Sequence, residues 1–257
     1  MSDYVYQHGF SQMHAEEMYD GERRNQKAMK TVAVLSDYLD RAGRDPADMT
    51  LLDIGCSTGF LSQTYGTLFG RVIGVDIDAE AVDFACRTHD AANVEYRVGD
   101  SMDLDFPDAA VDAVTCTQIY EHVPDSARLL AEIRRVLKPG GICYFAAGNR
   151  VKFMEAHYRL PFLSVVPKPL GHLYIRLAGK ADRYYETHLS LWGLRRLVRD
   201  FEVTDYTRRV VADPETFHAT EMVRPGSLKQ TVSLALLEVA YWLCPTYIWI
   251  LRKPEAG

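Results

Sequence analysis

Residues 51–60, LLDIGCSTGF, contain the transition that decides the fold, because an apolar run stops there and a glycine-punctuated turn follows. The run predicts a buried strand, and a turn of this kind is typical of a loop that wraps a nucleotide-like ligand. Gly55 and Gly59 permit backbone angles closed to other residues, and Asp53 supplies a carboxylate at the strand end. The sequence therefore predicts a ligand crevice at the carboxyl end of this strand.

A second acidic residue follows at a suitable distance. Residues 72–78, VIGVDID, form another apolar run that ends in Asp76. A carboxylate in this place can accept hydrogen bonds from both hydroxyls of a ribose. A nicotinamide-binding dehydrogenase would also carry an acid here, but its Gly-x-Gly-x-x-Gly fingerprint is absent from residues 55–60, so that alternative is disfavoured.

Four motifs in order carry a family resemblance: LLDIGCSTGFLS (51–62), GVDIDAEAVDFA (74–85), VGDSMDLDFPDAAVDAVTCTQIYEHVPD (98–125) and LKPGGICYFAA (137–147). This block resembles the class I S-adenosylmethionine-dependent methyltransferases, in particular the small-molecule, type 11-like branch with its ubiquinone and sterol methylating enzymes. The resemblance implies a doubly wound, mostly parallel seven-stranded α/β sheet, the Rossmann-like methyltransferase fold, and S-adenosylmethionine as cofactor. Ser57 stands where the family usually has its middle glycine, a place where a small hydroxyl is normally tolerated.

The resemblance also implies the cofactor-binding residues. The methionine portion of the cofactor would be surrounded by Asp53, Gly55, Ser57 and Gly59, and Asp76 would bind the ribose. Ile77 would flank the adenine, and Asp100 with Ser101 or Met102 would contact its amino edge. Gln118 would face the methyl donor. Asp100 has an alternative role as a cap of the turn that follows the third strand.

Three histidines are candidates for the catalytic base, because imidazole titrates near neutrality. His122 follows Glu121 after the fourth predicted strand, where a structural role or a place in the pocket wall is the alternative. Ubiquinone O-methyltransferases carry a further glutamate three residues before this Glu-His pair, a trio associated with a divalent metal. Gln118 removes that anionic ligand, so we predict no metal. His157 and His188 lie in a predicted lid, where each is either the base or a packing residue.

The order of predicted elements divides the chain into four parts. Residues 1–45 form an N-terminal helical region over the cofactor, and residues 46–148 form the cofactor-binding core. Strands are expected near 50–55, 71–76, 94–98, 111–117 and 141–147, with helices near 59–67, 79–89 and 125–137. Residues 149–190, interrupted by prolines, form a lid insertion after the fifth strand. Residues 191–257 complete the sheet through a helix at 191–200, strand-like residues at 201–211, a helix at 227–243 and a strand at 247–251.

The apolar run at 232–251 is long enough to suggest a membrane span. Pro245 splits it into a helix of about 24 Å and a short strand, which falls short of the ~30 Å hydrocarbon thickness. The second half of that helix is apolar on nearly every side, so it must be covered by the lid, by a second subunit or by a membrane surface. Residues 150–180 carry six basic residues against the single acid Glu155. This excess of positive charge suits lipid head groups or phosphorylated substrates. The alternative is an ordinary solvated surface.

Composition narrows the partners further. The net charge is −6 and no basic run is interleaved with aromatic residues, which disfavours a nucleic-acid substrate. Five isolated cysteines and an N-terminus without a secretion signal predict a reduced, cytoplasmic protein, either free or peripheral at the inner membrane face. We expect a methyltransferase of a small, lipophilic or lipid-linked acceptor, with oxygen favoured. The alternatives are a non-catalytic module that binds the cofactor and a C- or N-methyltransferase of a soluble metabolite.

Overall fold

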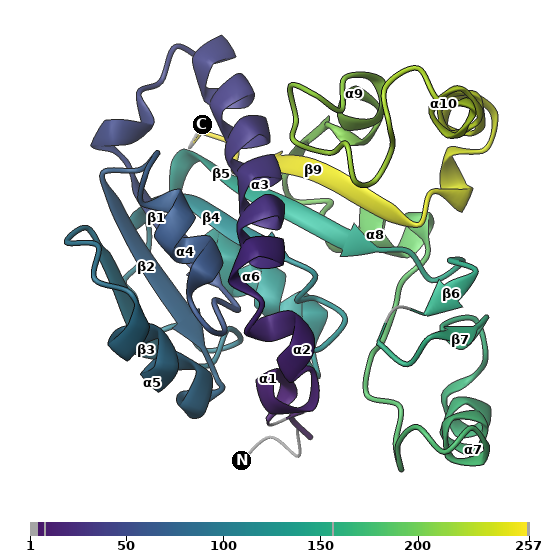
Figure 1. Ribbon diagram of the computed structural model, residues 1–257. Helices are drawn as coiled ribbons and strands as arrows, with labels where there is room; N and C mark the ends of the chain where they lie inside the picture. Colours follow the sequence, from purple (N-terminus) through teal and green to yellow (C-terminus); the bar gives the residue numbers. More distant parts are fainter. Residues whose placement is uncertain (1–4, 8, 156, 256–257) are drawn as a thin grey trace.

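A seven-stranded sheet forms the centre of the computed structural model, which describes residues 5–7, 9–155 and 157–255 (Figure 1). Its strand order is β3-β2-β1-β4-β5-β9-β8. The strands are β1 (Thr50–Ile54), β2 (Arg71–Asp76), β3 (Val94–Val98), β4 (Val111–Thr117), β5 (Leu137–Gly148), β8 (Glu202–Asp205) and β9 (Thr246–Arg252). The first five are parallel, whereas β9 runs antiparallel to both of its neighbours. The predicted doubly wound, mostly parallel sheet is confirmed.

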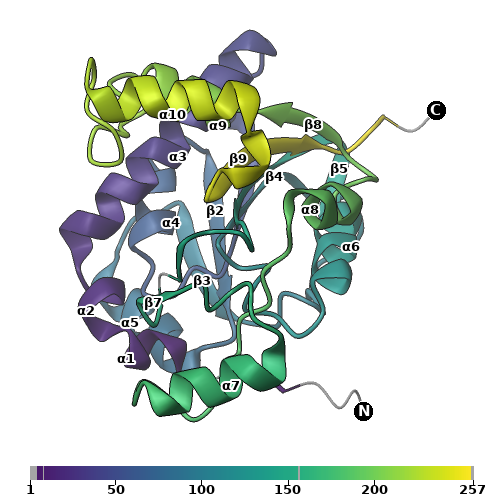
Figure 2. The ribbon, with the colours of Figure 1, turned by 90° about the vertical axis from the view of Figure 1, so that its right-hand side faces the viewer.

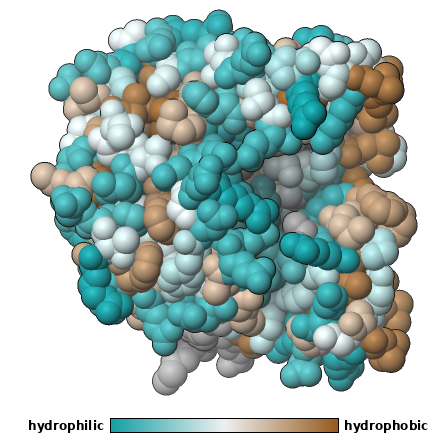
Figure 3. All heavy atoms as spheres, viewed as in Figure 1, coloured by the Kyte–Doolittle hydropathy of each residue, from teal (hydrophilic) through white to brown (hydrophobic). Residues whose placement is uncertain are grey.

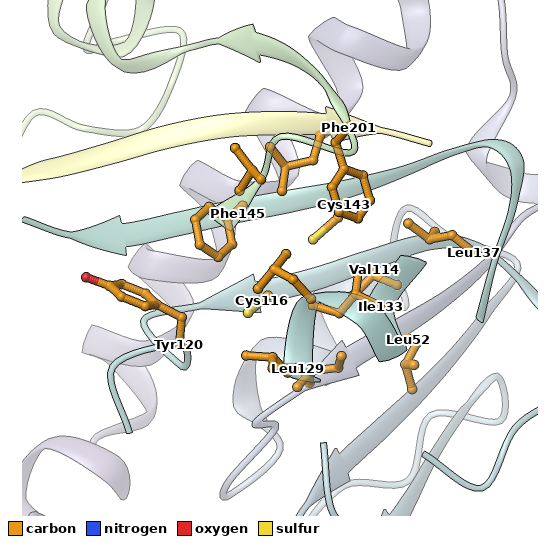
Figure 4. Packing of buried hydrophobic residues seen from close by; sticks show 14 of the residues in the cluster. Leu52, Val114, Cys116, Tyr120, Leu129, Ile133, Leu137, Cys143, Phe145 and Phe201 are labelled. Carbon is orange, nitrogen blue, oxygen red and sulfur yellow. The ribbon is translucent and has the colours of Figure 1, made fainter. Parts of the chain in front are cut away.

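Helices cover both faces of this sheet because successive strand residues point to opposite sides. Leu51 packs against α3 (Gly21–Arg41) and α4 (Phe60–Tyr65) in one buried cluster. Leu52 belongs to the opposite cluster, with α6 (Ser126–Val136) and α8 (Leu191–Leu197), part of which Figure 4 shows. The helix α5 (Ala79–Thr88) contacts β2 and β3. All carboxyl ends of the parallel strands therefore face one edge, where the crevice forms.

The N-terminal helical region consists of three helices, α1 (Phe10–Met13), α2 (Ala15–Met18) and the long α3. Asp20 caps α3 by accepting a hydrogen bond from the N–H of Arg23 at 3.1 Å. After Ala42 the chain turns through Gly43, which has a φ of 63°. A short 3-10 helix, η1 (Pro46–Asp48), then leads into β1.

The insertion at 149–190 contains a two-stranded hairpin, β6 (Met154–Glu155) and β7 (Leu160–Pro161), and the helix α7 (Lys168–Leu177). It leaves the sheet at Gly148, which pairs with Thr246 at the start of β9. The Nδ2 of Asn149 donates to the carbonyl oxygens of Trp242 and Cys244 at 2.8 and 2.7 Å. The insertion is thus fastened to the segment that precedes β9.

The C-terminal part differs from the prediction in two places. The strand expected over 201–211 is only β8, followed by the helix α9 (Thr207–Ala212). The Oδ1 of Asp205 accepts a hydrogen bond from the N–H of Thr207 at 2.8 Å and turns the chain into this helix. The helix expected over 227–243 divides into α10 (Leu228–Val239) and the 3-10 turn η2 (Tyr241–Leu243), because Ala240 has a non-helical φ of −142°.

The helix α10 lies beside α9 near one end of the molecule, whereas α7 of the insertion lies at the other end (Figures 1 and 2). The helix α7 of the insertion therefore does not cover α10, and none of the α10 side chains is buried. Within the described ranges, none of the helices has both the length and the apolar character that a bilayer crossing needs.

Candidate active site

The turn after β1 folds tightly against the neighbouring strands. The N–H of Gly55 donates to the carbonyl oxygen of Val75 at 2.8 Å, and its φ is 76°. Gly59, with a φ of 82°, begins α4, and a Cβ there would lie 2.7 Å from the Cβ of Ala85. Ser57 also has a left-handed φ, of 49°, and its N–H donates to Asp76 at 2.8 Å. Glycine is required at both ends of this turn, and the middle position accommodates a serine.

Asp53 lies at the floor of the crevice and is almost completely buried. Its two carboxylate oxygens accept hydrogen bonds from the hydroxyls of Ser62 and Thr115, both at 2.6 Å. Burial raises the pKa of Asp53 to about 6, although these hydrogen bonds and the charge of Arg24 act in the opposite direction. The remaining lone pairs of Asp53 are available to a cationic group in the crevice.

The carboxylates at the ends of β2 and β3 are held by backbone groups. Asp76 accepts from the N–H groups of Ser57 and Asp78, at 2.8 and 2.9 Å, and burial raises its pKa. Asp100 accepts from the N–H of Met102 at 2.8 Å and from the hydroxyl of Tyr6 at 2.5 Å. Both predicted roles of Asp100 are compatible with these contacts, since a turn cap leaves lone pairs for a ligand.

A cavity of about 740 Å³ opens at these strand ends. Figure 3 shows the hollow beside the ridge over α3. Its wall includes the predicted residues Asp53, Gly55, Ser57, Asp76, Ile77, Asp100, Ser101, Gln118, His122 and His157. Gly59, Met102 and His188 lie outside the wall, which departs from the prediction. Gly59 packs against Ala85, the Met102 side chain belongs to the core, and His188 has a buried side chain next to Glu155.

Two of the candidate histidines meet inside the cavity. The rings of His122 and His157 pack edge to face with centroids 4.8 Å apart, and Phe10 contacts both. The Nδ1–H of His157 donates to the Oε1 of Glu155 at 2.8 Å. A carboxylate can only accept, so Nε2 is the nitrogen that remains basic. Gln118, which follows the end of β4 with a φ of 57°, lines the same cavity.

The two histidines differ in basicity. Burial alone would lower the pKa of His157, but the hydrogen bond and the charge of Glu155 outweigh it and raise this pKa. Burial, together with His157 and His188, holds the pKa of His122 well below its usual range. His122 is therefore a neutral group in the cavity wall, and His157 is the stronger base.

The carboxyl group of Glu121 is buried beside Gln118 and His188, near Gly148. Neither of its oxygens has a hydrogen-bond partner within the described residues, and burial raises its pKa to about 7. In the part of the chain that the structure describes, no group of three or more His, Cys, Asp or Glu side chains is placed to hold a metal ion. The absence of a metal from the activity stays a prediction.

Several wall residues were not anticipated from the sequence. Arg24, Lys27 and Lys30 extend from one face of α3, and α9, α10 and the residues before β9 close the far side. The regular spacing of the three cations was a visible signal, because residues three apart share a helix face. Nothing local in the sequence indicates that α10 lies over the cavity, since this placement depends on the return of β9 to the sheet.

Fold and site together define a Rossmann-like α/β protein with a nucleoside crevice of the methyltransferase type. A family model described as "Methyltransferase domain" matches residues 52–145. The ubiquinone biosynthesis O-methyltransferase of Xanthomonas oryzae is 36% identical over 189 residues, which cover 72% of this chain and 73% of that relative. The chain belongs to the class I S-adenosylmethionine-dependent methyltransferases, and its methyl donor is S-adenosylmethionine.

Other comparisons agree with this assignment. The ubiquinone biosynthesis O-methyltransferase of Colwellia psychrerythraea is 32% identical over 107 residues, covering 40% of this chain and 43% of the relative. An S-adenosylmethionine-dependent methyltransferase from Mesorhizobium loti superposes with a TM-score of 0.52 at 18% identity, over 81% of this chain and 93% of that chain. Geranyl diphosphate C-methyltransferase from Streptomyces coelicolor gives 0.50 at 21% identity, over 87% and 77%. At these identities the solved structures support the fold alone.

Proposed function

We propose that the chain methylates an oxygen of a small, lipophilic or lipid-linked acceptor. The observation that carries this proposal is the pair formed by His157 and Glu155, a base that faces the cavity and is held by a buried carboxylate. The resemblance to ubiquinone biosynthesis O-methyltransferases supports the same acceptor class.

The residues of the crevice fit the cofactor. Arg24 and Asp53 supply opposite charges for the carboxylate and ammonium of its methionine end, and the Nε of Arg24 has no hydrogen-bond partner in the described chain. Asp76 is oriented by two N–H groups and keeps lone pairs for the ribose hydroxyls. Ile77, Asp100 and Ser101 would meet the adenine. When bound, the cofactor supplies an activated methyl group on a positively charged sulfur.

The reaction then requires alignment and removal of one proton. The Nε2 of His157 accepts the proton from the acceptor hydroxyl as its oxygen becomes the nucleophile. Glu155 stabilises the imidazolium and fixes the ring, because it also accepts from the N–H groups of His157 and Tyr158, both at 2.9 Å. Phe10 and the neutral His122 pack around the ring and exclude water from it.

A lipophilic acceptor is also supported by the outer surface. Leu177 of α7 is 78% exposed, and Leu228 and Val239 of α10 are 78% and 81% exposed. Both helices lie on the face that Figure 2 presents, and apolar atoms mark the same edge in Figure 3. Arg176 of α7 and Lys180 just after it are exposed next to these apolar side chains, so we infer peripheral contact with an anionic membrane surface. Flotation with liposomes tests this contact, and failure to float with or without anionic lipid would remove it.

Transfer of a radiolabelled methyl group into lipid and metabolite extracts tests the proposed activity. We expect a labelled, alkali-stable ether in the lipid fraction, and loss of most of this product in His157→Ala. A label found on carbon or nitrogen of a soluble metabolite would contradict the proposed acceptor. Binding of the cofactor without any transfer in either extract would instead favour the non-catalytic module.

A further inference from the structure

The cavity continues beyond the strand ends into a second region, which lies between α3 and α10. Its wall contains Lys27 and Lys30 from α3, Tyr144 from β5, Val210 from α9 and Leu237 from α10. We call this part the α3–α10 region. It is separate from the three acids at the ends of β1, β2 and β3, which fit the cofactor.

The two lysines of this region form no direct ion pair within the described residues. Lys27 and Lys30 are half-buried, and neither forms an ion pair within 4.0 Å in the described chain. The only polar atom that the Nζ of Lys30 contacts there is the sulfur of Met222, at 3.3 Å. Burial and the neighbouring cations lower the pKa of both lysines, and the more distant charge of Glu221 acts in the opposite direction without reversing the shift. Half-buried ammonium groups without a direct ion pair, in a chain of net charge −6, leave room for a bound anion beside them.

The rest of the region is apolar. Val210 and Val211 of α9, Leu236 and Leu237 of α10, and Ile248 of β9 line it. An apolar lining beside two cations suits a molecule with an acidic head and a hydrocarbon part.

The carboxylate of the cofactor does not account for this charge. Arg24 lies closest to the acids at the strand ends, as its electrostatic coupling to Asp53 and Asp76 shows. Lys30 lies six residues further along α3, which is about 9 Å along the helix axis. One carboxylate cannot reach both ends of this row, so Lys30 and its neighbour Lys27 serve a second anion.

We propose that the α3–α10 region binds the phosphate or carboxylate head of an amphiphilic acceptor, with Lys27 and Lys30 as the cations and with α9 and α10 against the hydrocarbon part. This inference rests on the proposed function, because it assigns the ligand of this region as the methyl acceptor. It narrows that function from lipophilic acceptors in general to acidic amphiphiles.

Calorimetric titration with decyl phosphate, decanol and inorganic phosphate tests the proposal, with the protein saturated by S-adenosylhomocysteine. We expect decyl phosphate to bind at least tenfold more tightly than either comparison compound. Lys27→Met and Lys30→Met should each weaken decyl phosphate about tenfold and leave decanol within twofold. Lys30→Arg should retain most of the affinity. Lys180→Met, a change within the basic segment 150–180, should have no effect.

Equal affinity for decyl phosphate and decanol in the unaltered protein would overturn the proposal without any variant being needed. Equal affinity for decyl phosphate and inorganic phosphate would overturn the amphiphile part. The acidic amphiphile could be a membrane lipid or a dissolved molecule, and sedimentation with vesicles that contain or lack phosphatidic acid separates these two sources. Lysine-dependent sedimentation with the acidic vesicles assigns a membrane lipid. Binding of monomeric decyl phosphate without such sedimentation assigns a dissolved amphiphile. Failure of the proposed methyltransferase activity is distinguished by its own readouts, cofactor-product binding and methyl transfer.

Discussion

Replacing Glu121 by glutamine should make the protein more stable at alkaline pH relative to the unaltered chain. The carboxyl group is fully buried, and its pKa is raised from 4.5 to about 7 by burial. Between these two pH values the unfolded chain has released a proton that the folded chain still holds. The free energy of unfolding therefore falls as the pH rises through this window. Glutamine does not titrate and escapes this loss.

The size of the effect follows from the same two values. The gap between 4.5 and about 7 corresponds to about 3.4 kcal/mol of unfolding free energy, lost by the unaltered chain and not by the variant. The buried amide adds an offset of about 1–3 kcal/mol, but this offset is the same at every pH. The informative quantity is thus the change in the difference between the two proteins from pH 4 to pH 8.

Urea denaturation of both proteins at half-unit steps of pH measures this change. The matched control is Glu215→Gln, because Glu215 is exposed and its side chain forms no hydrogen bond or ion pair within the described residues. The control should track the unaltered protein at every pH. If the difference between Glu121→Gln and the unaltered protein were the same at pH 5 and pH 8, the assignment of Glu121 as a buried neutral acid would be refuted.

Three further changes test the site and the turn. Asp76→Ala should weaken S-adenosylhomocysteine binding by about 3 kcal/mol, roughly a hundredfold, because two hydrogen bonds to a charged acceptor are lost. Calorimetry measures this affinity, with Asp103→Ala as the exposed control. An unchanged affinity would contradict the ribose role of Asp76. Glu155→Gln should lower kcat and move the acidic limb of the pH profile of kcat to lower pH, because Glu155 raises the pKa of His157. An acidic limb at the same pH in both proteins would argue against His157 as the base. Gly59→Ala should lower the free energy of unfolding by about 1–3 kcal/mol, since φ is 82° and the added Cβ would lie 2.7 Å from the Cβ of Ala85. Thermal unfolding measures the loss. A Tm equal to that of the unaltered protein would contradict the expected strain.

The first four strands were predictable to within one residue, because β1, β2 and β4 are short apolar runs and β3 alternates apolar or aromatic with charged residues, each between turn residues. The fifth strand is longer than expected, since Leu137 pairs with Val111 across a register shift, a contact that no local pattern shows. The error at 201–211 has a different origin. Residues 206–212 include β-branched side chains that favour a strand, but Asp205 captures the N–H of Thr207 and starts a helix instead.

The same contrast holds for the site. Acids at the ends of consecutive parallel strands converge by topology, so Asp53, Asp76 and Asp100 could be brought together from the sequence. Lys27 and Lys30 reach the cavity only because α3 packs across the sheet, and α10 reaches it only because β9 re-enters the sheet beside β5. Placements of this kind depend on long-range packing.

The pairing of Gly148 with Thr246 has a consequence for how such a chain diversifies. The segment 149–190 begins directly after Gly148 and the segment 206–245 ends directly before Thr246, and Asn149 ties the two together there. Neither segment supplies the acids at the ends of β1, β2 and β3. The two could therefore be exchanged jointly for those of another member of the family, as a cassette that retargets the enzyme while the donor half of the crevice is inherited unchanged.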